Sequence, residues 1–371
     1  MHKDTLFTGD SGPVAASWPA PESGMTRAFV TVCGHQMSYV TGGSGPPMVL
    51  LHGLGANCFT WRFALPTLIQ HNTIYAPDMF GCGESDKAGM DFSLDAMAEY
   101  VNGFMEAVGL QSAIFVGHSL GGGITMQYCH RYPGHAERIV LVSSGGMGRD
   151  LHWLLRISTL PGANSVIGAM ADPRTRLPQI SRTMEQRRMQ QLAQEFDPNT
   201  PTMLDRFQSY ETRQAFLGML RGVGSLQGQR ISALDHLTEL TVPVLLIWGA
   251  RDGTIPVSHG LQAASIIPCA HLEVVPNCYH RPQIEAPQKF CELVLKFLDS
   301  AVWPPPSAEV LAHDASVAGA AHLAHQPRWH VSAATWRRLA PALAPVALAA
   351  LTVPTGMFMR SRVRRRQRLL L

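Results

Sequence analysis

Cysteines are few in this sequence and never stand in pairs. The 371 residues include seven cysteines, and no C-x-x-C motif joins any two of them. Disulfide frameworks and cysteine-based zinc sites both need several cysteines at short, regular spacings. The scattered thiols therefore favour a reduced, cytoplasmic protein over a disulfide-stabilised or zinc-binding one, and we expect no metal ion and no organic cofactor.

The first residues lack the apolar run of a secretory signal peptide. Residues 1–22 are polar and contain several Pro, Gly and Ser residues. A signal peptide needs a continuous apolar core behind a positively charged start. We therefore expect residues 1–25 to form a flexible leader rather than a targeting segment.

The chain before residue 302, which we call the body, also lacks an excess of basic residues. Its net charge is +3, but residues 302–371 alone carry nine arginines against Glu309 and Asp314, which is +7, so the remainder carries −4. Proteins that bind nucleic acid usually present a basic patch on the folded domain. We therefore expect no nucleic-acid partner and treat the basic tail separately from the body.

Residues 301–371 form a tail rich in Pro, Ala and Arg. Residues 339–359 contain no charged side chain, and six arginines follow up to Arg368. The apolar length suits a membrane span with a cytoplasmic C-terminus, but three prolines interrupt it. Three interpretations stay open: a disordered tail, a peripheral membrane-binding segment over residues 339–368, and a transmembrane helix.

Short apolar runs alternate with helix-like segments along the body. Residues 94–108 place apolar side chains at i, i+3, i+4 and i+7 behind Ser93 as N-cap, and a shorter helix is predicted over residues 61–69. This alternation predicts an α/β fold: a mostly parallel, twisted sheet with helices on both faces. The predicted strands cover residues 27–32, 37–40, 48–51, 73–77, 113–116, 138–142, 242–249 and 271–275, the first two as an antiparallel hairpin.

The alternation stops after residue 146. Residues 147–229 contain no strand-like run, are rich in Met, Leu, Arg and Gln, and are interrupted by five prolines. This pattern predicts a cap of several short helices inserted into the sheet. The core would then comprise residues 26–146 and 230–300.

A glycine-rich stretch follows the predicted strand at residues 113–116. Its sequence, Gly117-His118-Ser119-Leu120-Gly121, stands between that strand and a helix-like segment. A Cβ at either glycine would crowd a tight turn, so the pattern fits a G-x-S-x-G nucleophile elbow.

Four further blocks follow predicted strands. They are His52-Gly53-Leu54-Gly55, Asp78-x-x-Gly81-x-Gly83-x-Ser85, Gly249-x-x-Asp252-x-x-Ile255-Pro256 and His280-x-Pro282-x-x-Glu285-x-Pro287. With the elbow in this order, the chain resembles the α/β-hydrolase family, in its serine-nucleophile, esterase- and lipase-like branch, over roughly residues 26–299.

The resemblance implies a role for each of five residues. Ser119 would be the nucleophile, His280 the base that takes its proton, and Asp252 the acid that orients the imidazole. The backbone N–H groups of Leu54 and Leu120 would form the oxyanion hole. The order Ser, Asp, His along the chain is the one that this fold uses.

Other polar residues near these blocks have simpler interpretations. His118 is expected to pack at the elbow, and His52 to order the oxyanion loop rather than to transfer protons. Asp252 could also be a turn residue ahead of Gly253. The chain departs from the family's pattern at Tyr279, where glycine is frequent, and this departure bears on the backbone of the histidine loop.

Ser119 at the elbow narrows the reaction. Relatives that open epoxides or remove halide place Asp there, so we predict a serine hydrolase that cleaves a small or medium apolar carboxylic ester through an acyl-enzyme. The alternatives are a carbon–carbon bond hydrolase of diketone-like ring-cleavage products, a cofactor-free perhydrolase or haloperoxidase, and a ligand receptor on the same fold. Residues predicted to line an apolar acyl pocket, besides Leu54, are Phe59, Trp61, Met147, Trp153 and Leu155.

Overall fold

The computed structural model of the protein describes residues 18–19, 23–192, 201–230 and 234–300. Most of the predicted leader, the whole tail from residue 301 and the predicted membrane segment 339–368 lie outside the described residues. Within the described ranges, no helix combines the length and the apolar character that a membrane crossing needs.

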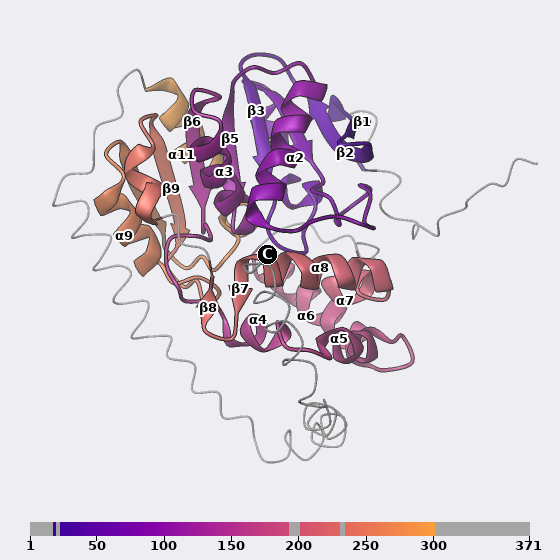
Figure 1. Ribbon diagram of the computed structural model, residues 1–371. Helices are drawn as coiled ribbons and strands as arrows, with labels where there is room; N and C mark the ends of the chain where they lie inside the picture. The colour runs from indigo at the N-terminus through magenta and orange to yellow at the C-terminus, as the bar shows by residue number, and fades with distance from the viewer. Residues whose placement is uncertain (1–17, 20–22, 193–200, 231–233, 301–371) are drawn as a thin grey trace, which may run out of the picture.

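An eight-stranded sheet forms the centre of the protein (Figure 1). Its strands are β1 (Met25–Val32), β2 (His35–Gly42), β3 (Pro47–Leu51), β4 (Thr73–Pro77), β5 (Ala113–His118), β6 (Ala136–Val142), β9 (Val244–Gly249) and β10 (Ala270–Val275). They lie in the order β1-β2-β4-β3-β5-β6-β9-β10. β1 and β2 form the predicted antiparallel hairpin, β2 pairs antiparallel with β4, and the other neighbouring pairs are parallel.

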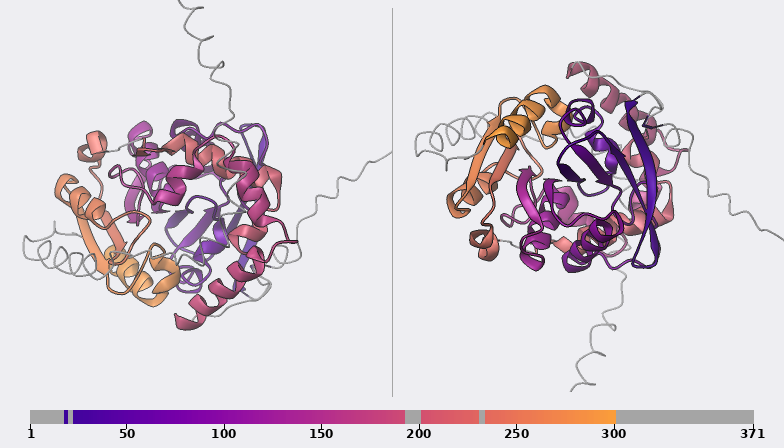
Figure 2. Two further views of the ribbon diagram at one scale, coloured as in Figure 1. Left: turned by 90° about the horizontal axis from the view of Figure 1, so that it is seen from below. Right: turned by 90° about the horizontal axis from the view of Figure 1, so that it is seen from above.

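Helices cover both faces of this sheet because its central strands are apolar on both sides. The helices of the core are α1 (Leu65–Leu68), α2 (Leu94–Ala107), α3 (Leu120–Arg131), α9 (Ser258–Ile266), α10 (Pro282–Glu285) and α11 (Pro287–Asp299). Val49 and Leu51 of β3 join the core beneath α2, α3 and α9. Met48 and Leu50, which point the opposite way, join the core beneath α1 and α11. Figure 2 shows these two layers on opposite sides of the sheet, which confirms the predicted α/β class.

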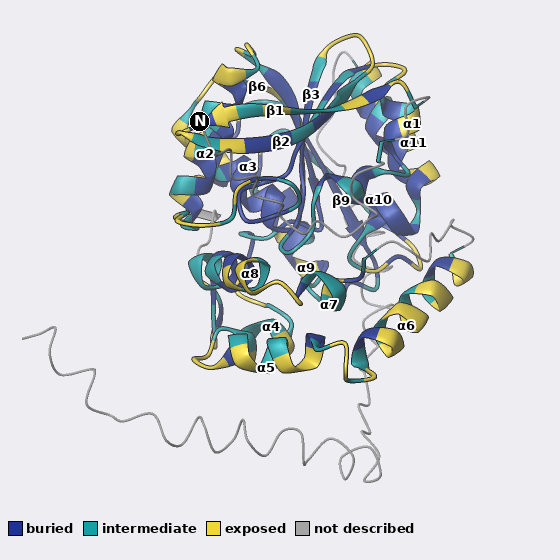
Figure 3. Ribbon diagram, turned by 90° about the vertical axis from the view of Figure 1, so that its right-hand side faces the viewer, coloured by how far each residue is buried: buried dark blue, intermediate teal, exposed yellow. Residues whose placement is uncertain are grey.

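Residues 147–229 contribute helices that lie at the lower edge of the sheet in Figure 1. They are α4 (Trp153–Ser158), α5 (Ala163–Ala171), α6 (Leu177–Gln191), α7 (Met203–Arg206) and α8 (Tyr210–Val223). The segment also contains a two-stranded hairpin, β7 (Gly224–Ser225) with β8 (Gly228–Gln229), where no strand was predicted. Strands of two residues are too short to show an apolar period. Figure 3 shows that α6 keeps much of its surface exposed.

The predicted helix over residues 61–69 is shorter than expected. A 3-10 turn, η3 (Cys58–Trp61), precedes the four-residue helix α1. Pro66 stands in the first turn of α1, where its missing N–H costs nothing, but it prevents a helix from running through that position. A second 3-10 element, η4 (Leu234–Glu239), leads from the cap back to β9.

All seven cysteines are free thiols, as the sequence predicted. Four of them are buried, and burial raises the pKa of Cys82 to about 12. Such thiols stay protonated at neutral pH and serve as small apolar side chains.

The parallel strands bring the predicted site residues to one edge of the sheet. His52 follows β3, Ser119 follows β5, Asp252 lies three residues after β9, and His280 lies five residues after β10. Ligands of open α/β sheets bind at the carboxyl ends of the strands. This edge faces the helices of the cap (Figure 1).

Candidate active site

Three predicted residues from three separate loops form one hydrogen-bonded chain. The Oγ of Ser119 lies 3.1 Å from Nε2 of His280, and Nδ1 of His280 lies 2.8 Å from Oδ2 of Asp252. Ser119 and His280 are 161 residues apart in the sequence, so the sheet is what brings them together. The chain can pass the hydroxyl proton to the imidazole while the carboxylate holds the opposite ring nitrogen.

The backbone of Ser119 adopts a strained conformation, with φ 54° and ψ −115°. Its N–H donates a 2.9 Å hydrogen bond to the carbonyl of Val142, which helps to hold the turn. A Cβ on Gly117 would stand 2.6 Å from the carbonyl oxygen of Gly121, and a Cβ on Gly121 would collide with the carbonyl of Leu51. The two glycines of the motif are therefore required by the close approach of three backbone segments.

Asp252 fills both of the roles that the sequence left open. Its Oδ1 accepts hydrogen bonds from the N–H groups of Thr254, at 2.8 Å, and Ile255, at 3.0 Å, as a turn residue does. Its Oδ2 faces His280, and the carboxylate is fully buried. The fixed acceptor favours the tautomer with the proton on Nδ1 of His280, which leaves Nε2 free to accept from Ser119.

The histidine loop accommodates Tyr279 without strain. The residue of this loop with positive φ is Asn277, at 57°, and not Tyr279. Asn adopts that conformation more readily than most residues. The backbone of this loop passes close to Gly249, where a Cβ would collide with the carbonyl of Tyr279. Tyr279 is therefore compatible with the hydrogen bonds that His280 makes to Ser119 and Asp252.

Leu120 and Leu54 lie beside Ser119, where an oxyanion would form. Leu120 is the first residue of α3, so its N–H has no acceptor within the helix and lies at the positive end of the helix dipole. Leu54 and Leu120 line the same cavity as Ser119 and His280. The two backbone N–H groups remain the predicted donors to an oxyanion formed at Ser119.

His52 joins the oxyanion loop to the loop after β4. Its Nε2 accepts a 3.0 Å hydrogen bond from the N–H of Met79, and its Nδ1 lies 2.9 Å from the carbonyl of Gly53. Burial lowers its pKa below the usual value. A neutral imidazole with the proton on Nδ1 satisfies both contacts, so His52 orders the loop as predicted.

His118 forms a hydrogen bond with the backbone of the loop that carries His280. Its Nε2 lies 2.9 Å from the carbonyl of His280, so this nitrogen carries a proton and donates it. Burial, and then the neighbouring charge of His280, hold the pKa of His118 well below its ordinary value. The side chain is a neutral donor at neutral pH and fixes the backbone of the residue that faces Ser119.

A cavity of about 320 Å³ opens above Ser119, between the core and the cap. Its walls come from the oxyanion loop, α4, α7, α8 and the loop after β9, and most of its lining side chains are apolar. The apolar residues contributed by the cap and the segment before it include Leu151, Leu154, Leu155, Met203, Phe216 and Leu220. A cavity of this size and character suits a small or medium apolar ligand.

Four of the predicted pocket residues do not line this cavity, and that prediction is corrected here. Trp61 and Met147 are fully buried in the two cores that cover opposite faces of the sheet. Trp153 is 54% exposed, and Phe59 is half-buried outside the cavity. Apolar residues close to the loops in sequence can serve the core instead, because strand and helix directions decide where they point. Leu155 does line the cavity.

Sequence reasoning missed several residues of the cavity wall. Phe216 and Leu220 stand four positions apart on α8 and point into the cavity together, with His152 and Thr254 as polar neighbours. The apolar period of α8 could have identified a buried helix face. It could not have shown that part of this face lines a cavity rather than the core.

One cluster of side chains among the described residues could hold a metal ion, and it lies away from the cavity. It consists of His130, His236 and Glu239. None of the three lines the space above Ser119.

Comparisons with known proteins identify the fold family. The family model for the alpha/beta hydrolase fold matches residues 46–287. An uncharacterized protein of Mycobacterium tuberculosis is 34% identical over 280 residues, which cover 74% of this chain and 82% of that protein. A 2-hydroxymuconate semialdehyde hydrolase of Pseudomonas sp. (strain CF600) is 29% identical over 269 residues, or 70% of this chain and 89% of that protein.

Solved structures show the same fold. A meta-cleavage product hydrolase from Pseudomonas fluorescens IP01 superposes with a TM-score of 0.58 at 24% identity, covering 73% of this chain and 97% of that one. A carboxylesterase from Bacillus subtilis superposes with a TM-score of 0.56 at 20% identity, covering 78% and 95%. With the sheet order, the serine at the strand-to-helix turn and the family model in agreement, the chain belongs to the alpha/beta hydrolase fold family.

Proposed function

We propose that the protein is a serine hydrolase that cleaves neutral carboxylic esters of small or medium apolar acids. The observation that carries this proposal is the hydrogen-bonded series Ser119–His280–Asp252, whose Ser119 end lines an apolar cavity. A hydroxyl is a weak nucleophile at neutral pH, and a base within hydrogen-bond reach activates it.

The proposed reaction has two halves. The Oγ of Ser119 attacks the ester carbonyl while Nε2 of His280 takes the hydroxyl proton, and His280 then gives that proton to the departing alcohol. Water, deprotonated by His280, attacks the acyl-enzyme and releases the acid. In both halves Asp252 stabilises the imidazolium, and the N–H groups of Leu54 and Leu120 stabilise the oxyanion, each donor by about 3–4 kcal/mol.

The charge of the cavity favours a neutral substrate. Among the described residues that line it there is no lysine or arginine, and the polar side chains near Ser119 include Gln229 and Thr254. An ionised substrate group would lose its hydration there without gaining a counter-charge, which costs several kcal/mol in effect. A neutral ester has no such penalty.

A second candidate function is hydrolysis of a carbon–carbon bond in a ring-cleavage product. The names of several relatives support it, among them the 2-hydroxymuconate semialdehyde hydrolase. Their substrates carry a carboxylate, and arginines lie near the cavity: Arg281 follows His280, and Arg206 lies one turn after the cavity residue Met203. Burial, then the positive charges of Arg281 and Arg206, lower the pKa of Arg62 to about 10. None of these three arginines lines the cavity, and Arg281 already pairs with Glu185 at 3.2 Å. The names of the relatives, rather than the charge of the cavity, therefore support this candidate.

A substrate panel separates the candidates. We expect p-nitrophenyl acetate, butyrate and octanoate to be hydrolysed with kcat/KM values well above that for a 2-hydroxy-6-oxo-dienoate, and no peroxide-dependent halogenation. Ser119→Ala should abolish the ester activity. Preference for the dienoate would favour the second candidate, and an activity that survives Ser119→Ala would refute the role of Ser119 in both.

A further inference from the structure

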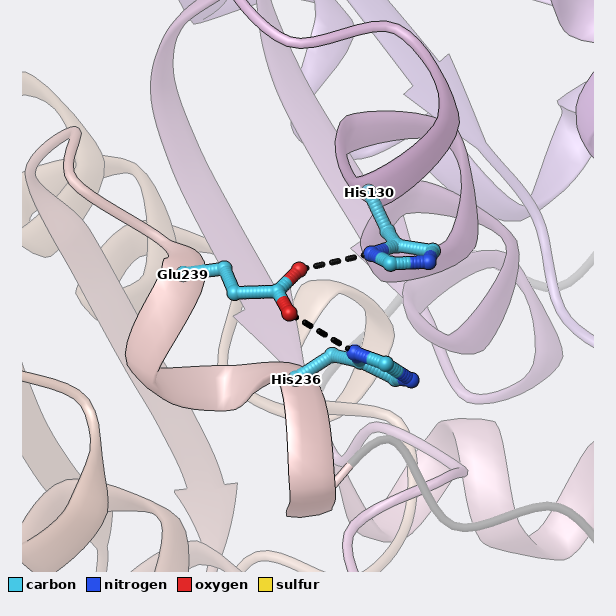
Figure 4. Close-up of side chains that lie close together, drawn as sticks. All are labelled: His130, His236 and Glu239. Atoms are coloured by element: carbon cyan, nitrogen blue, oxygen red, sulfur yellow. Dashed lines mark hydrogen bonds and ion pairs between the residues drawn. The ribbon is translucent and has the colours of Figure 1, made fainter.

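A cluster of three metal-ligating side chains lies on the surface at the far end of α3. Nδ1 of His130 lies 2.6 Å from one carboxylate oxygen of Glu239, and Nδ1 of His236 lies 2.9 Å from the other. Figure 4 shows the two imidazoles on the same side of the carboxylate, each facing one oxygen. All three ligand atoms lie within 4.8 Å of one another.

The three side chains come from two well-anchored elements. His130 is in the last turn of α3, and His236 and Glu239 stand three positions apart on η4, so they share one face of that turn. Leu237 of η4 and Leu240, the residue directly after η4, are buried in the core that also contains residues of α3, and they anchor the turn there. The ligand atoms are thus held near one another by the fold, while the side chains themselves stay exposed to solvent.

The arginine next to His130 in the sequence is paired elsewhere. Arg131 follows His130, but its guanidinium pairs with Asp95 at 3.2 Å and Glu99 at 3.0 Å, on α2. With neutral imidazoles, His130, His236 and Glu239 together carry one negative charge. That balance suits a divalent cation.

We propose that His130, His236 and Glu239 bind a Zn²⁺ ion, at what we call the α3–η4 site. Two imidazole nitrogens and one carboxylate oxygen are ligands that zinc accepts, with water in the fourth position. Around one tetrahedral ion, ligand atoms stand about 3.3 Å apart. The two imidazole–carboxylate pairs, now at 2.6 and 2.9 Å, would open slightly around the ion. Because all ligand atoms lie within 4.8 Å of one another, no pair would close by more than about 1.5 Å. Rotation of exposed side chains can supply that movement.

The chemistry of the ligands excludes the common hard cations. Mg²⁺ and Ca²⁺ take six or more ligands, nearly all oxygen, and bind imidazole poorly. Borderline transition metals prefer imidazole nitrogen. The α3–η4 site should therefore discriminate strongly between Zn²⁺ and Mg²⁺.

A zinc ion here would join two parts of the proposed catalytic framework. α3 begins directly after Ser119, and η4 leads from the cap to β9, which is followed by Asp252. His130 lies ten residues after Leu120, the first residue of α3, which is about 15 Å along the helix at 1.5 Å per residue. The ion would thus hold the return from the cap against α3 without contacting substrate.

The test is a zinc titration of the full-length protein, stripped with EDTA and followed by calorimetry. The starting protein carries Cys33→Ser, because Cys33 is exposed and is itself a zinc ligand. Against that protein, His130→Gln, His236→Gln and Glu239→Gln should each lose one equivalent of bound Zn²⁺ or bind it at least about tenfold more weakly. His71→Gln and Glu211→Gln, at exposed positions elsewhere, should keep it.

Thermal unfolding provides a second measurement. Zinc at about a hundredfold excess over Kd should raise Tm by roughly 3–8 °C in the starting protein and not in the three variants. All variants should share one Tm in EDTA, and excess Mg²⁺ should not displace zinc. Equal zinc stoichiometry and affinity in all proteins, or full competition by Mg²⁺, would overturn the site and leave a hydrogen-bonded cluster only.

Discussion

The guanidinium of Arg188, on cap helix α6, pairs with the buried carboxylate of Glu285, five residues after His280. Glu285 also accepts hydrogen bonds from the backbone N–H groups of Tyr279, at 2.5 Å, and Arg281, at 3.3 Å. The carboxylate therefore holds the chain on both sides of His280, and Arg188 balances its charge from the cap. This ion pair therefore connects the cap to the loop that carries the proposed base, His280.

We expect Arg188→Ala to weaken both folding and catalysis. It would leave the carboxylate of Glu285 buried without its partner, and such a change costs about 3 kcal/mol, at the lower end of the usual range because Arg188 is itself partly exposed. The histidine loop would then hold His280 less firmly. Urea unfolding should report the loss of stability, and ester hydrolysis should show a fall in kcat larger than any rise in KM.

Two further variants make this prediction specific. Arg188→Lys restores the charge and should recover part of kcat, whereas Arg187→Ala, at the neighbouring exposed position of α6, should behave as the wild type. If Arg187→Ala and Arg188→Ala had equal effects, the loss would reflect α6 in general rather than the pair with Glu285.

The glycines of α3 provide a matched pair of variants on one helix. A Cβ on Gly121 would collide with the carbonyl of Leu51, whereas a Cβ on Gly123 would stand 3.6 Å from the nearest atom, the carbonyl oxygen of Gly145. Gly121→Ala should therefore destabilise the protein by about 3 kcal/mol or more. Gly123→Ala should stabilise it by roughly 0.5–1 kcal/mol, because alanine has the better helix propensity. Equal values of Tm for the two variants would contradict the close approach at the elbow.

Much of the fold and the loops of the site could be predicted because their signals are local. The strands are continuous apolar runs, and the elbow is marked by Gly117 and Gly121, whose spacing follows from the turn itself. Because each of the five sequence motifs follows a predicted strand, their loops could be placed together at the carboxyl edge of a parallel sheet.

The helices of the cap could be predicted, but its contacts could not, because they join residues far apart in the sequence. Arg188 and Glu285 are 97 residues apart, and no period or motif connects them. Phe216 and Leu220 line the cavity because of how α8 packs, while Trp61 and Met147, closer to the motifs in sequence, belong to the core. The apolar character of a side chain predicts that it will be buried. Whether it then contacts the core or lines the cavity depends on how the helices pack.

We expect Asp252→Asn to reduce kcat by about 10⁴-fold while the fold is retained, since the amide can donate to Nδ1 and select the wrong tautomer of His280. KM for p-nitrophenyl butyrate should change little. Asp95→Asn, at an exposed position of α2, serves as the control and should keep wild-type kcat. A loss below about tenfold in kcat for Asp252→Asn would mean that another group orients His280.

Two buried histidines, His118 and His52, predict a loss of stability in mild acid. Burial lowers the pKa of His118 and of His52 in the folded protein, while unfolding returns each to about 6.5. Below that pH the unfolded chain binds protons that the folded protein does not, so the free energy of unfolding must fall as pH decreases. Well below pH 6.5, each histidine adds a slope of up to about 1.4 kcal/mol per pH unit.

His118→Asn tests this dependence while keeping a side-chain donor for the carbonyl of His280. The groups whose charge bears on His118 are His280, Arg281 and His52, and the substitution leaves all of them in place. Urea unfolding between pH 5 and 7 should give a shallower slope for this variant than for the wild type, by up to about 1.4 kcal/mol per pH unit. His71→Asn, at an exposed position, should keep the wild-type slope. Equal slopes for His118→Asn and the wild type would mean that the folded protein protonates His118 as readily as the unfolded chain does.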